Sequence, residues 1–194
     1  MIFDSLYHSW FKPGILMRPK NNHVSAMSKP FVAVLMGSDS DLKTMQACLD
    51  VLDQLEVPCE VKITSAHRTP DTTHAYVKDA DRRGCAVFIA AAGLAAHLAG
   101  TVAGLTLKPV IGVPMDAGPL DGMDALLSTV MMPGGIPVAS VAIGKAGARN
   151  AGYLAAQMLA LSDEALAGRL QADRQANADA VRAKDAELQA RLKK

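Results

Sequence analysis

Short apolar runs alternate with stretches of helical periodicity from Phe31 onward, and this alternation constrains the fold more than any other feature. The runs read FVAVLM, PCEVKIT, AVFIAAA, KPVIGVP and IPVASVAI. Between the first two, apolar residues recur at helical spacing, as at Leu42, Met45, Leu49 and Leu52. Apolar strands that alternate with helices indicate a parallel sheet covered on both sides. We therefore expect an α/β fold: a three-layer sandwich with a doubly wound, five-stranded parallel sheet in flavodoxin-like order.

The chain divides by composition into three parts. Residues 1–28 hold half of all the aromatic residues but no continuous apolar segment of the kind found in secretory signals, so we expect a disordered N-terminal extension. Residues 29–162 carry the alternating pattern and form the main domain. Residues 163–194 are rich in helix formers of mixed charge, with a weak apolar stripe, and this predicts a C-terminal helical arm. The arm is either solvated or packed on a neighbouring subunit.

Bulk properties argue against several classes of protein. The formal net charge of +1 provides no basic field for nucleic acid. No apolar run reaches the ~18–20 residues of a membrane span. The cysteines, Cys48, Cys59 and Cys85, form no CxxC pair, and no Cys/His cluster has metal-ligand spacing. We expect a reduced, cytoplasmic protein without a metal site.

The stretch MGSDSDL follows the first predicted strand and opens the first helix. Ser38 and Asp41 have the spacing of a capping box, which is a sufficient structural explanation. The functional alternative is that the helix N-terminus and the serine hydroxyl bind a phosphate. Asp41 would repel phosphate, so it would accept hydrogen bonds from sugar hydroxyls instead. The stretch is not a Walker loop, because GxxxxGK[ST] is absent.

The stretch SAHRTP places Ser65, His67 and Arg68 at the carboxyl end of the second predicted strand. Thr69 and Pro70 then suit the N-cap and first position of a helix. Doubly wound sheets bind ligands at this edge. Arg68 offers a rigid fork of donors for phosphate, and an imidazole such as that of His67 exchanges protons near neutral pH. A surface pair without function is the alternative interpretation.

The stretch GLAAHLAG follows the third predicted strand. Gly93 and the alanines around it allow a flat ligand to approach the backbone closely. His97 either closes a pocket or is a satisfied histidine near a helix start. Neither a GxGxxG dinucleotide fingerprint nor a nucleophile elbow is present. The combination indicates phosphate recognition with one acid–base histidine, and without metal.

Taken together, these stretches resemble the PurE family of purine biosynthesis, the N5-carboxyaminoimidazole ribonucleotide mutases. The resemblance extends from about Pro30 to Leu161 and rests on VLMGSDSD, SAHRTP, GLAAHLAG, PVIGVP and LDGMDALLSTVMMPGGIPVASVAIGKAGARNAG in this order. It implies that residues 29–162 form a catalytic domain with flavodoxin-like fold, in a homo-octamer whose sites are shared between subunits. It also implies an isomerase of IMP biosynthesis that moves a carboxylate from N5 to C4 of an aminoimidazole ribonucleotide. No ATP, metal or organic cofactor is implied.

The resemblance also implies roles for individual residues. His67 would be the general acid–base residue. The phosphate and ribose of the nucleotide would be held by Ser38, Asp41, Ser65 and Arg68. The pocket itself would be shaped by Gly93 and His97.

Two departures from the family pattern concern the pocket loop, which commonly reads GGAAHLPG. Leu94 stands in place of the second glycine and Ala99 in place of the proline, which changes loop flexibility or pocket shape. A sister class carboxylates aminoimidazole ribonucleotide directly with carbon dioxide and tends to carry lysine where Arg68 stands. Arg68 therefore favours the mutase, with the direct carboxylase as the alternative. A non-catalytic flavodoxin-like module for FMN or another phosphorylated ligand is an alternative from a different class, although few aromatic residues are available to stack on a flavin.

Overall fold

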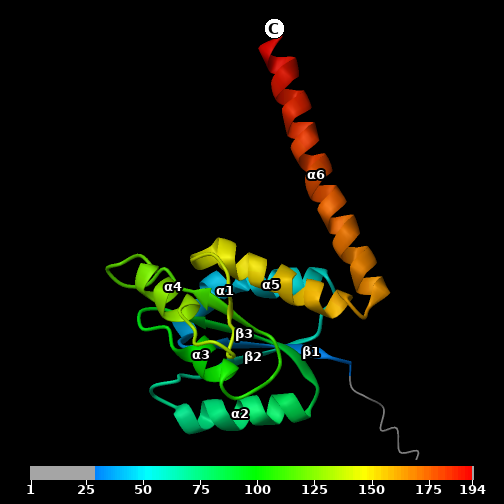
Figure 1. Cartoon of the computed structure of the whole chain (residues 1–194). Coiled ribbons are helices and arrows are strands. Elements are labelled where there is room, and N and C mark those ends of the chain that lie inside the picture. The colour runs from blue at the N-terminus through cyan, green and yellow to red at the C-terminus, as the bar shows by residue number, and fades with distance from the viewer. Residues whose placement is uncertain (1–28, 194) are drawn as a thin grey trace, which may run out of the picture.

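The structure, a computed structural model, describes residues 29–193 and is built around one parallel sheet (Figure 1). The extension predicted for residues 1–28 lies outside the described residues. The strand order is β2-β1-β3-β4-β5, the flavodoxin-like order expected from the sequence. The strands are β1 (Phe31–Met36), β2 (Cys59–Ile63), β3 (Cys85–Ala92), β4 (Val110–Pro114) and β5 (Ala139–Ser140).

Helices cover both faces of the sheet and make it a three-layer sandwich (Figure 1). One face carries α1 (Leu42–Gln54) and α5 (Gly144–Ala160), and the other carries α2 (Pro70–Arg82), α3 (Leu98–Ala103) and α4 (Met123–Val130). Alternate residues of one strand therefore enter two different cores, because side chains of a strand point to opposite faces in turn.

β1 shows this division most clearly, since all of its residues are buried. Val32 and Val34 pack in the core under α1 and α5, whereas Ala33 and Leu35 pack in the core under α2 and α3. With few aromatic residues in the chain, both cores consist mainly of small and branched aliphatic side chains.

The two edge strands differ from the pattern predicted for them. In β2, Cys59, Val61 and Ile63 are exposed, because α1 packs over the centre of the sheet and leaves this face of the edge strand open. The run IPVASVAI predicted a full fifth strand, but β5 has only two residues. One residue beyond β5, the Val141 N–H donates a hydrogen bond to the Gly112 carbonyl of β4 and so extends the pairing.

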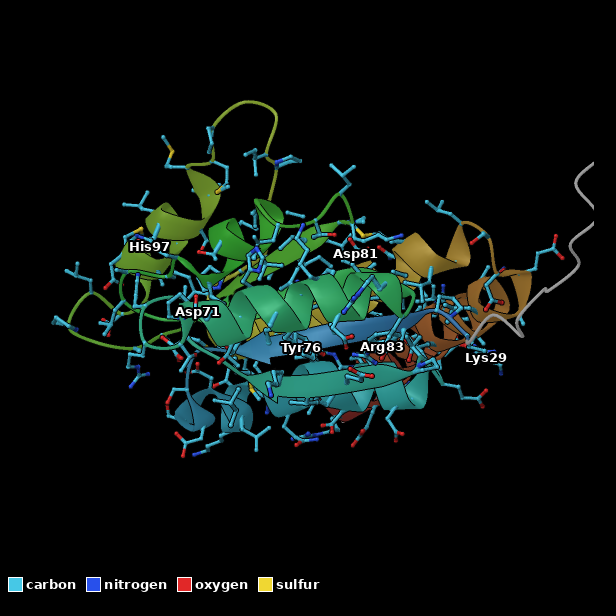
Figure 2. The ribbon with its side chains drawn as sticks, turned by 90° about the horizontal axis from the view of Figure 1, so that it is seen from below. Lys29, Asp71, Tyr76, Asp81, Arg83 and His97 are labelled. Atoms are coloured by element: carbon cyan, nitrogen blue, oxygen red, sulfur yellow. The ribbon has the colours of Figure 1, made fainter. Side chains whose placement is uncertain are left out.

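Figure 2 views the sandwich from the α2 side and shows its two ends. Lys29, which precedes β1, lies at one end of the sheet, and His97, which follows β3, lies at the other. The carboxyl ends of the strands, where ligands of doubly wound sheets bind, are therefore at the His97 end.

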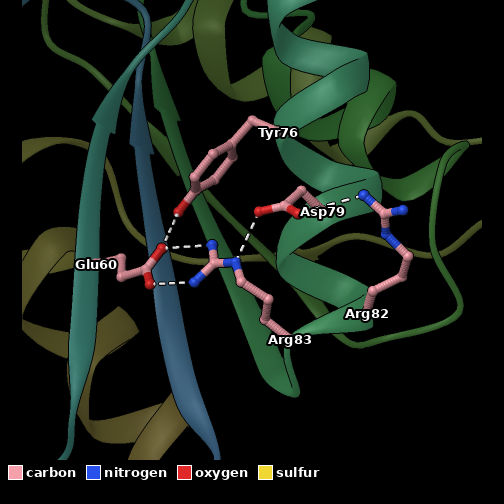
Figure 3. Close-up of polar contacts among 5 residues, drawn as sticks. All are labelled: Glu60, Tyr76, Asp79, Arg82 and Arg83. Atoms are coloured by element: carbon pink, nitrogen blue, oxygen red, sulfur yellow. Dashed lines mark hydrogen bonds and ion pairs between the residues drawn. The ribbon is translucent and has the colours of Figure 1, made fainter.

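A polar network fixes α2 on the edge strand (Figure 3). Glu60 of β2 accepts hydrogen bonds from Tyr76 Oη at 3.1 Å and from Arg83 Nη2 at 2.8 Å. Arg83 Nε also donates to Asp79 at 2.7 Å, and Arg82 donates to the same carboxylate at 3.3 Å. The hydrogen bond from Arg83 holds the pKa of Glu60 below its usual value. The network joins the sheet edge to the C-terminal half of α2.

The C-terminal helical arm expected from the sequence is α6 (Glu164–Leu192). Leu166 in its first turn is buried in the core under α1 and α5. Two turns later, the Asp173 carboxylate accepts hydrogen bonds from Gln54 Nε2 of α1 at 2.5 Å and from Tyr153 Oη of α5 at 2.8 Å. Beyond this joint the helix projects away from the sandwich (Figure 1), and nearly all of its side chains are exposed.

Candidate active site

Three loops meet at the carboxyl edge of the sheet. They follow β1, β2 and β3 and comprise residues 37–41, 64–69 and 93–97. β1 lies between the other two strands. The connection after β1 runs through α1 on one face of the sheet and the connection after β3 runs through α3 on the other, so strand order reverses between β1 and β3. All seven predicted site residues lie on these loops: Ser38, Asp41, Ser65, His67, Arg68, Gly93 and His97.

The first loop contains the capping box expected from its sequence. Ser38 Oγ accepts the Ser40 N–H at 3.3 Å, and Asp41 Oδ2 accepts the Ser38 N–H at 3.2 Å. The turn, η1 (Asp39–Asp41), leads directly into α1. Burial raises the pKa of Asp41 above its ordinary value, against the lowering effect of the hydrogen bond from Ser38. Asp41 is therefore both a capping residue and a partly buried carboxyl at the edge of the site.

Sequence reasoning overlooked one hydroxyl of this loop. Ser40 Oγ lies 2.9 Å from Ser38 Oγ, so two serine hydroxyls share one turn. The repeat SDS within the motif is the signal that was available. Two adjacent hydroxyls offer an anion more hydrogen-bond donors than one.

The second loop is a closed turn. The Thr69 N–H donates to the Ser65 carbonyl at 2.9 Å, and Thr69 Oγ1 accepts the Ser65 N–H at 2.9 Å. Ser65 Oγ in turn accepts the Arg68 N–H at 3.1 Å. Thr69 is the N-cap of α2, as predicted, but its side chain makes no capping hydrogen bond because its hydroxyl closes this turn instead. The buried hydroxyls of Thr64 and Thr73, 2.7 Å apart, attach the turn to α2.

Arg68 connects the second loop to the first. Its guanidinium Nη2 donates a hydrogen bond to the Gly37 carbonyl oxygen at 3.3 Å. The side chain is exposed. A guanidinium beside two serine hydroxyls has the donor geometry that recognises phosphate.

His67 and His97 connect the second loop to the third. His67 Nε2 and His97 Nδ1 are 2.8 Å apart, and the rings meet edge to face, with centroids 4.9 Å apart and planes at 77°. One nitrogen must donate and the other accept, so each ring fixes the tautomer of the other. Both rings are exposed at the edge of the sheet. The sequence marked both histidines without indicating that they touch.

In the third loop, the absence of a side chain at Gly93 lets residues 115–117 pack closely against the backbone. A Cβ at this position would lie 2.9 Å from Ala117 Cβ and 3.4 Å from Met115 Cβ. The neighbour that approaches the Gly93 backbone is thus the loop after β4. His97 itself lies just before α3, whose first residue, Leu98, is buried.

Three cavities of the subunit lie away from these loops. One of 840 Å³ lies between α5 and α6, one of 1010 Å³ lies beside the loop before β5, and one of 650 Å³ lies beside Lys29. None of these three is lined by the seven site residues. In a single subunit, His67, Arg68 and His97 are exposed at the sheet edge, and Ser38, Asp41, Ser65 and Gly93 are partly buried.

Residues 29–193 contain no group of three or more His, Cys, Asp or Glu side chains arranged to hold a metal ion. Among the helices of this same region, none has both the length and the apolar character needed to cross a membrane.

The chain is similar to proteins of known activity. Residues 31–180 match the family described as AIR carboxylase. The N5-carboxyaminoimidazole ribonucleotide mutase of Bacillus subtilis is 56% identical over 142 residues, which cover 73% of this chain and 88% of that protein. The protein of the same description from Mycobacterium tuberculosis is 51% identical over 164 residues, 84% of this chain and 93% of the relative. The crystal structure of Treponema denticola PurE superposes with a TM-score of 0.75 at 28% identity, over 82% of this chain and 99% of that one.

Proposed function

The chain belongs to the AIR carboxylase family, and on this premise we propose that it is an N5-carboxyaminoimidazole ribonucleotide mutase. It is an isomerase that converts N5-carboxyaminoimidazole ribonucleotide into 4-carboxy-5-aminoimidazole ribonucleotide in IMP biosynthesis. Relatives of that description are 51–56% identical over most of the chain. The observation in the structure that carries the proposal is the contact of His67 with His97, one residue away from the phosphate-binding candidate Arg68.

The nucleotide is anchored by the first two loops. Arg68 and the hydroxyls of Ser38 and Ser65 bind the phosphate, and Asp41 accepts hydrogen bonds from the ribose. The hydrogen bond from Arg68 to the Gly37 carbonyl supports this division, because it keeps the cation beside the serine turn. Anchoring the sugar phosphate places the imidazole ring of the substrate against the third loop, near Gly93 and the two histidines.

The chemistry requires one proton to move as the carboxylate moves. The bond from N5 to the carboxylate breaks and releases carbon dioxide, and N5 gains a proton. The nucleophilic C4 then attacks the carbon dioxide, which gives an intermediate with both a proton and a carboxylate on C4. His67 removes that proton from C4 and so restores the aromatic ring. The proton lost from C4 balances the proton gained at N5. No net proton, electron or cofactor is needed.

His97 contributes by fixing the imidazole of His67. His67 Nε2 lies 2.8 Å from His97 Nδ1, and this hydrogen bond restricts the rotation and the tautomer of the His67 ring before substrate binds. Gly93 and the small residues beside it narrow the space in which carbon dioxide is held between the two bond changes.

A homo-octamer in the cytoplasm completes the proposal. His67, Arg68 and His97 are exposed in one subunit, as expected where a neighbouring subunit closes the site. The outer face of α4 supports self-association. This face, together with the residue that follows the helix, exposes apolar side chains at helical spacing. These are Met123, Leu127, Val130 and Met131, exposed by 52%, 54%, 47% and 78%.

The direct carboxylase is the second candidate, and a comparison of substrates separates the two. Purified protein is given either N5-carboxyaminoimidazole ribonucleotide or aminoimidazole ribonucleotide with bicarbonate, and formation of the C4-carboxylated product is followed. The mutase predicts much faster turnover of the first substrate. Faster turnover of the second would establish the carboxylase, and no turnover of either would favour a non-catalytic binding module.

A further inference from the structure

Leu94 has an unusual backbone conformation for its residue type. Its φ is +57°, in the left-handed region that a leucine rarely adopts, and its side chain is 52% exposed. Both features are unfavourable, so neither fold stability nor core packing explains why leucine occupies this position. Strained residues of this kind persist where surrounding contacts hold them and often mark functional sites.

The covered part of the Leu94 side chain lies over Gly118. A Cβ at Gly118 would collide with Leu94 Cδ2, so the leucine occupies the space that any other residue at position 118 would need. Next to this contact, Gly93 packs closely on Ala117. The loop 93–97 is thus joined to the loop after β4 by two adjacent contacts.

Three residues further along the same loop is His97. Ala96, between them, is buried, and the His97 N–H donates to the Ala95 carbonyl at 2.8 Å, so the loop is a tight turn with little freedom of its own. His97 Nδ1 then lies 2.8 Å from His67 Nε2. A displacement of the loop at Leu94 would therefore move the His97 ring relative to His67.

We propose that Leu94 is a positioning residue: by packing over Gly118 it holds the loop 93–97 so that His97 keeps its contact with the acid–base residue His67. The inference rests on the proposed function and deepens it, since it adds a residue that acts on the proton-transfer step through His97. Leu94 supports that step without touching the phosphate cradle of Ser38, Ser65 and Arg68. The expected defect of a variant is consequently in kcat and not in KM.

The test compares four variants of the full-length protein in the mutase assay. Leu94→Gly relieves the backbone strain and removes the contact with Gly118. Leu94→Asn introduces a residue that tolerates positive φ but removes the apolar side chain over Gly118. Leu94→Met retains an apolar side chain and serves as the conservative rescue. Leu107→Gly is the matched control, since Leu107 is an exposed loop leucine with 104% relative exposure.

The Gly and Asn variants at position 94 are expected to lose ~10-fold or more in kcat, because a misplacement of about 1 Å can cost ~100-fold. KM is expected to stay within about twofold, as the anchoring groups are unchanged. The Met variant should recover most of kcat, and Leu107→Gly should match the wild type. Wild-type kcat in Leu94→Gly, or a rise in KM at constant kcat, would overturn the inference.

A double-mutant cycle tests the route through His97. If Leu94 acts only by placing His97, then Leu94→Gly in a His97→Asn background lowers kcat no further. A full additional loss would mean that Leu94 acts in another way, and the inference would be wrong.

An independent readout separates failure of the inference from failure of the proposed function. If the wild type has no mutase activity, the function is wrong, and imidazole ¹⁵N spectra decide the positioning role alone. The inference requires the ring signals of His67 and His97 to change in Leu94→Gly and to remain in Leu107→Gly. Unchanged ring signals in Leu94→Gly would refute it.

Discussion

Two imidazoles that are 30 residues apart in the sequence lie 2.8 Å apart at the edge of the sheet. Each imidazole belongs to a short loop with restricted conformation. Hydrogen bonds within the Ser65–Thr69 turn hold the first loop, and the buried Ala96 holds the loop that precedes His97. The charged and hydroxyl groups of the first two loops lie at the same edge of the sheet, where Arg68 connects the two loops. At this scale, the proposed activity depends on a division between anchoring residues and the histidine that transfers the proton.

Replacement of Arg68 by alanine tests the anchoring role. The expected result is a rise of about 10- to 100-fold in KM for the nucleotide, because a hydrogen bond to a charged group contributes about 1.5–3 kcal/mol. The kcat at saturating substrate should change much less, since His67 and His97 remain in place. Steady-state kinetics measure both quantities, and an unchanged KM would remove Arg68 from the phosphate site.

Replacement of Asp41 by asparagine separates function from stability. Burial raises the pKa of Asp41, so the folded state holds this proton more tightly than the unfolded state does. Stability therefore falls as pH rises from the ordinary value of 3.8 through the raised value, and above it the ionised carboxylate is unfavourable. The Asn variant should have an equal or higher Tm at pH 7, and this difference should disappear near pH 3.8.

The same Asp41→Asn variant should bind the nucleotide more weakly, by about tenfold in KM, if the carboxylate accepts hydrogen bonds from the ribose. Thermal unfolding at two pH values and steady-state kinetics provide the measurements. A lower Tm at pH 7 would contradict the stability argument, and an unchanged KM would contradict the ribose contact.

At the scale of elements, the close packing of α1 against α5 holds the first core together. Gly152 of α5 faces α1, and a Cβ there would lie 3.0 Å from the Cys48 carbonyl oxygen and 3.0 Å from Val51 Cβ. Ala148, Ala155 and other small residues of α5 are buried along the same helix. Small side chains thus let two helix backbones approach closely over the strand that carries the Ser38 loop.

Replacement of Gly152 by valine is expected to destabilise the fold by about 1–3 kcal/mol, the usual cost of overpacking a tight core. Gly168→Val is the matched control, because Gly168 of α6 is exposed and a Cβ there meets nothing within 4 Å. The control should change stability by less than about 0.5 kcal/mol. Thermal melts at equal protein concentration compare the two, and equal Tm values would show that α1 and α5 are not tightly packed at Gly152.

At the scale of the whole molecule, one subunit has a partly exposed site, an exposed apolar face on α4 and a helix that projects away from the sandwich (Figure 1). α6 begins at the end of the sheet near Lys29, away from the site of its own chain. All three features are unfavourable or unexplained in a monomer. They are consistent with the proposed assembly, in which neighbouring subunits cover the apolar face and close each site.

Introduction of charge on α4 tests this assembly. Leu127→Glu should break the oligomer into smaller species, because a charged group in an apolar interface is desolvated without a partner. Light scattering after size-exclusion chromatography measures the mass, and the activity should fall with it if sites are shared. Leu107→Glu is the exposed control that should keep the wild-type mass, and an intact, active Leu127→Glu oligomer would exclude this face from the interface.

Much of the fold was predictable because it depends on local patterns. Apolar runs and helical periodicity indicated the parallel sheet and its order, and the SxxD spacing of Ser38 and Asp41 indicated the capping box. The shortness of β5 and the exposure of β2 were not predictable, since edge strands differ from central ones through neighbours that sequence periodicity does not describe.

Each candidate site residue could be assigned to its loop from the sequence, but the arrangement of these residues could not be predicted. Motifs placed His67 after the second strand and His97 after the third, which are separated by β1 in the sheet, whereas their direct contact depends on the twist of the sheet and the length of each loop. The left-handed backbone of Leu94 was also not predictable, because leucine itself disfavours it. Thr69 occupies the predicted N-cap position of α2, but the closure of the preceding turn by its hydroxyl was not predictable from residue type and position.

The central claim is that His67 transfers the proton while other residues hold the nucleotide, and His67→Asn tests it most directly. Binding of the nucleotide is measured by titration calorimetry and turnover of N5-carboxyaminoimidazole ribonucleotide by product formation, on the same preparation. The account predicts an unchanged Tm, an affinity within about threefold of wild type, and turnover reduced by at least ~100-fold, since general acid–base catalysis contributes ~10²–10⁴. Turnover near the wild-type rate with the asparagine in place would contradict it.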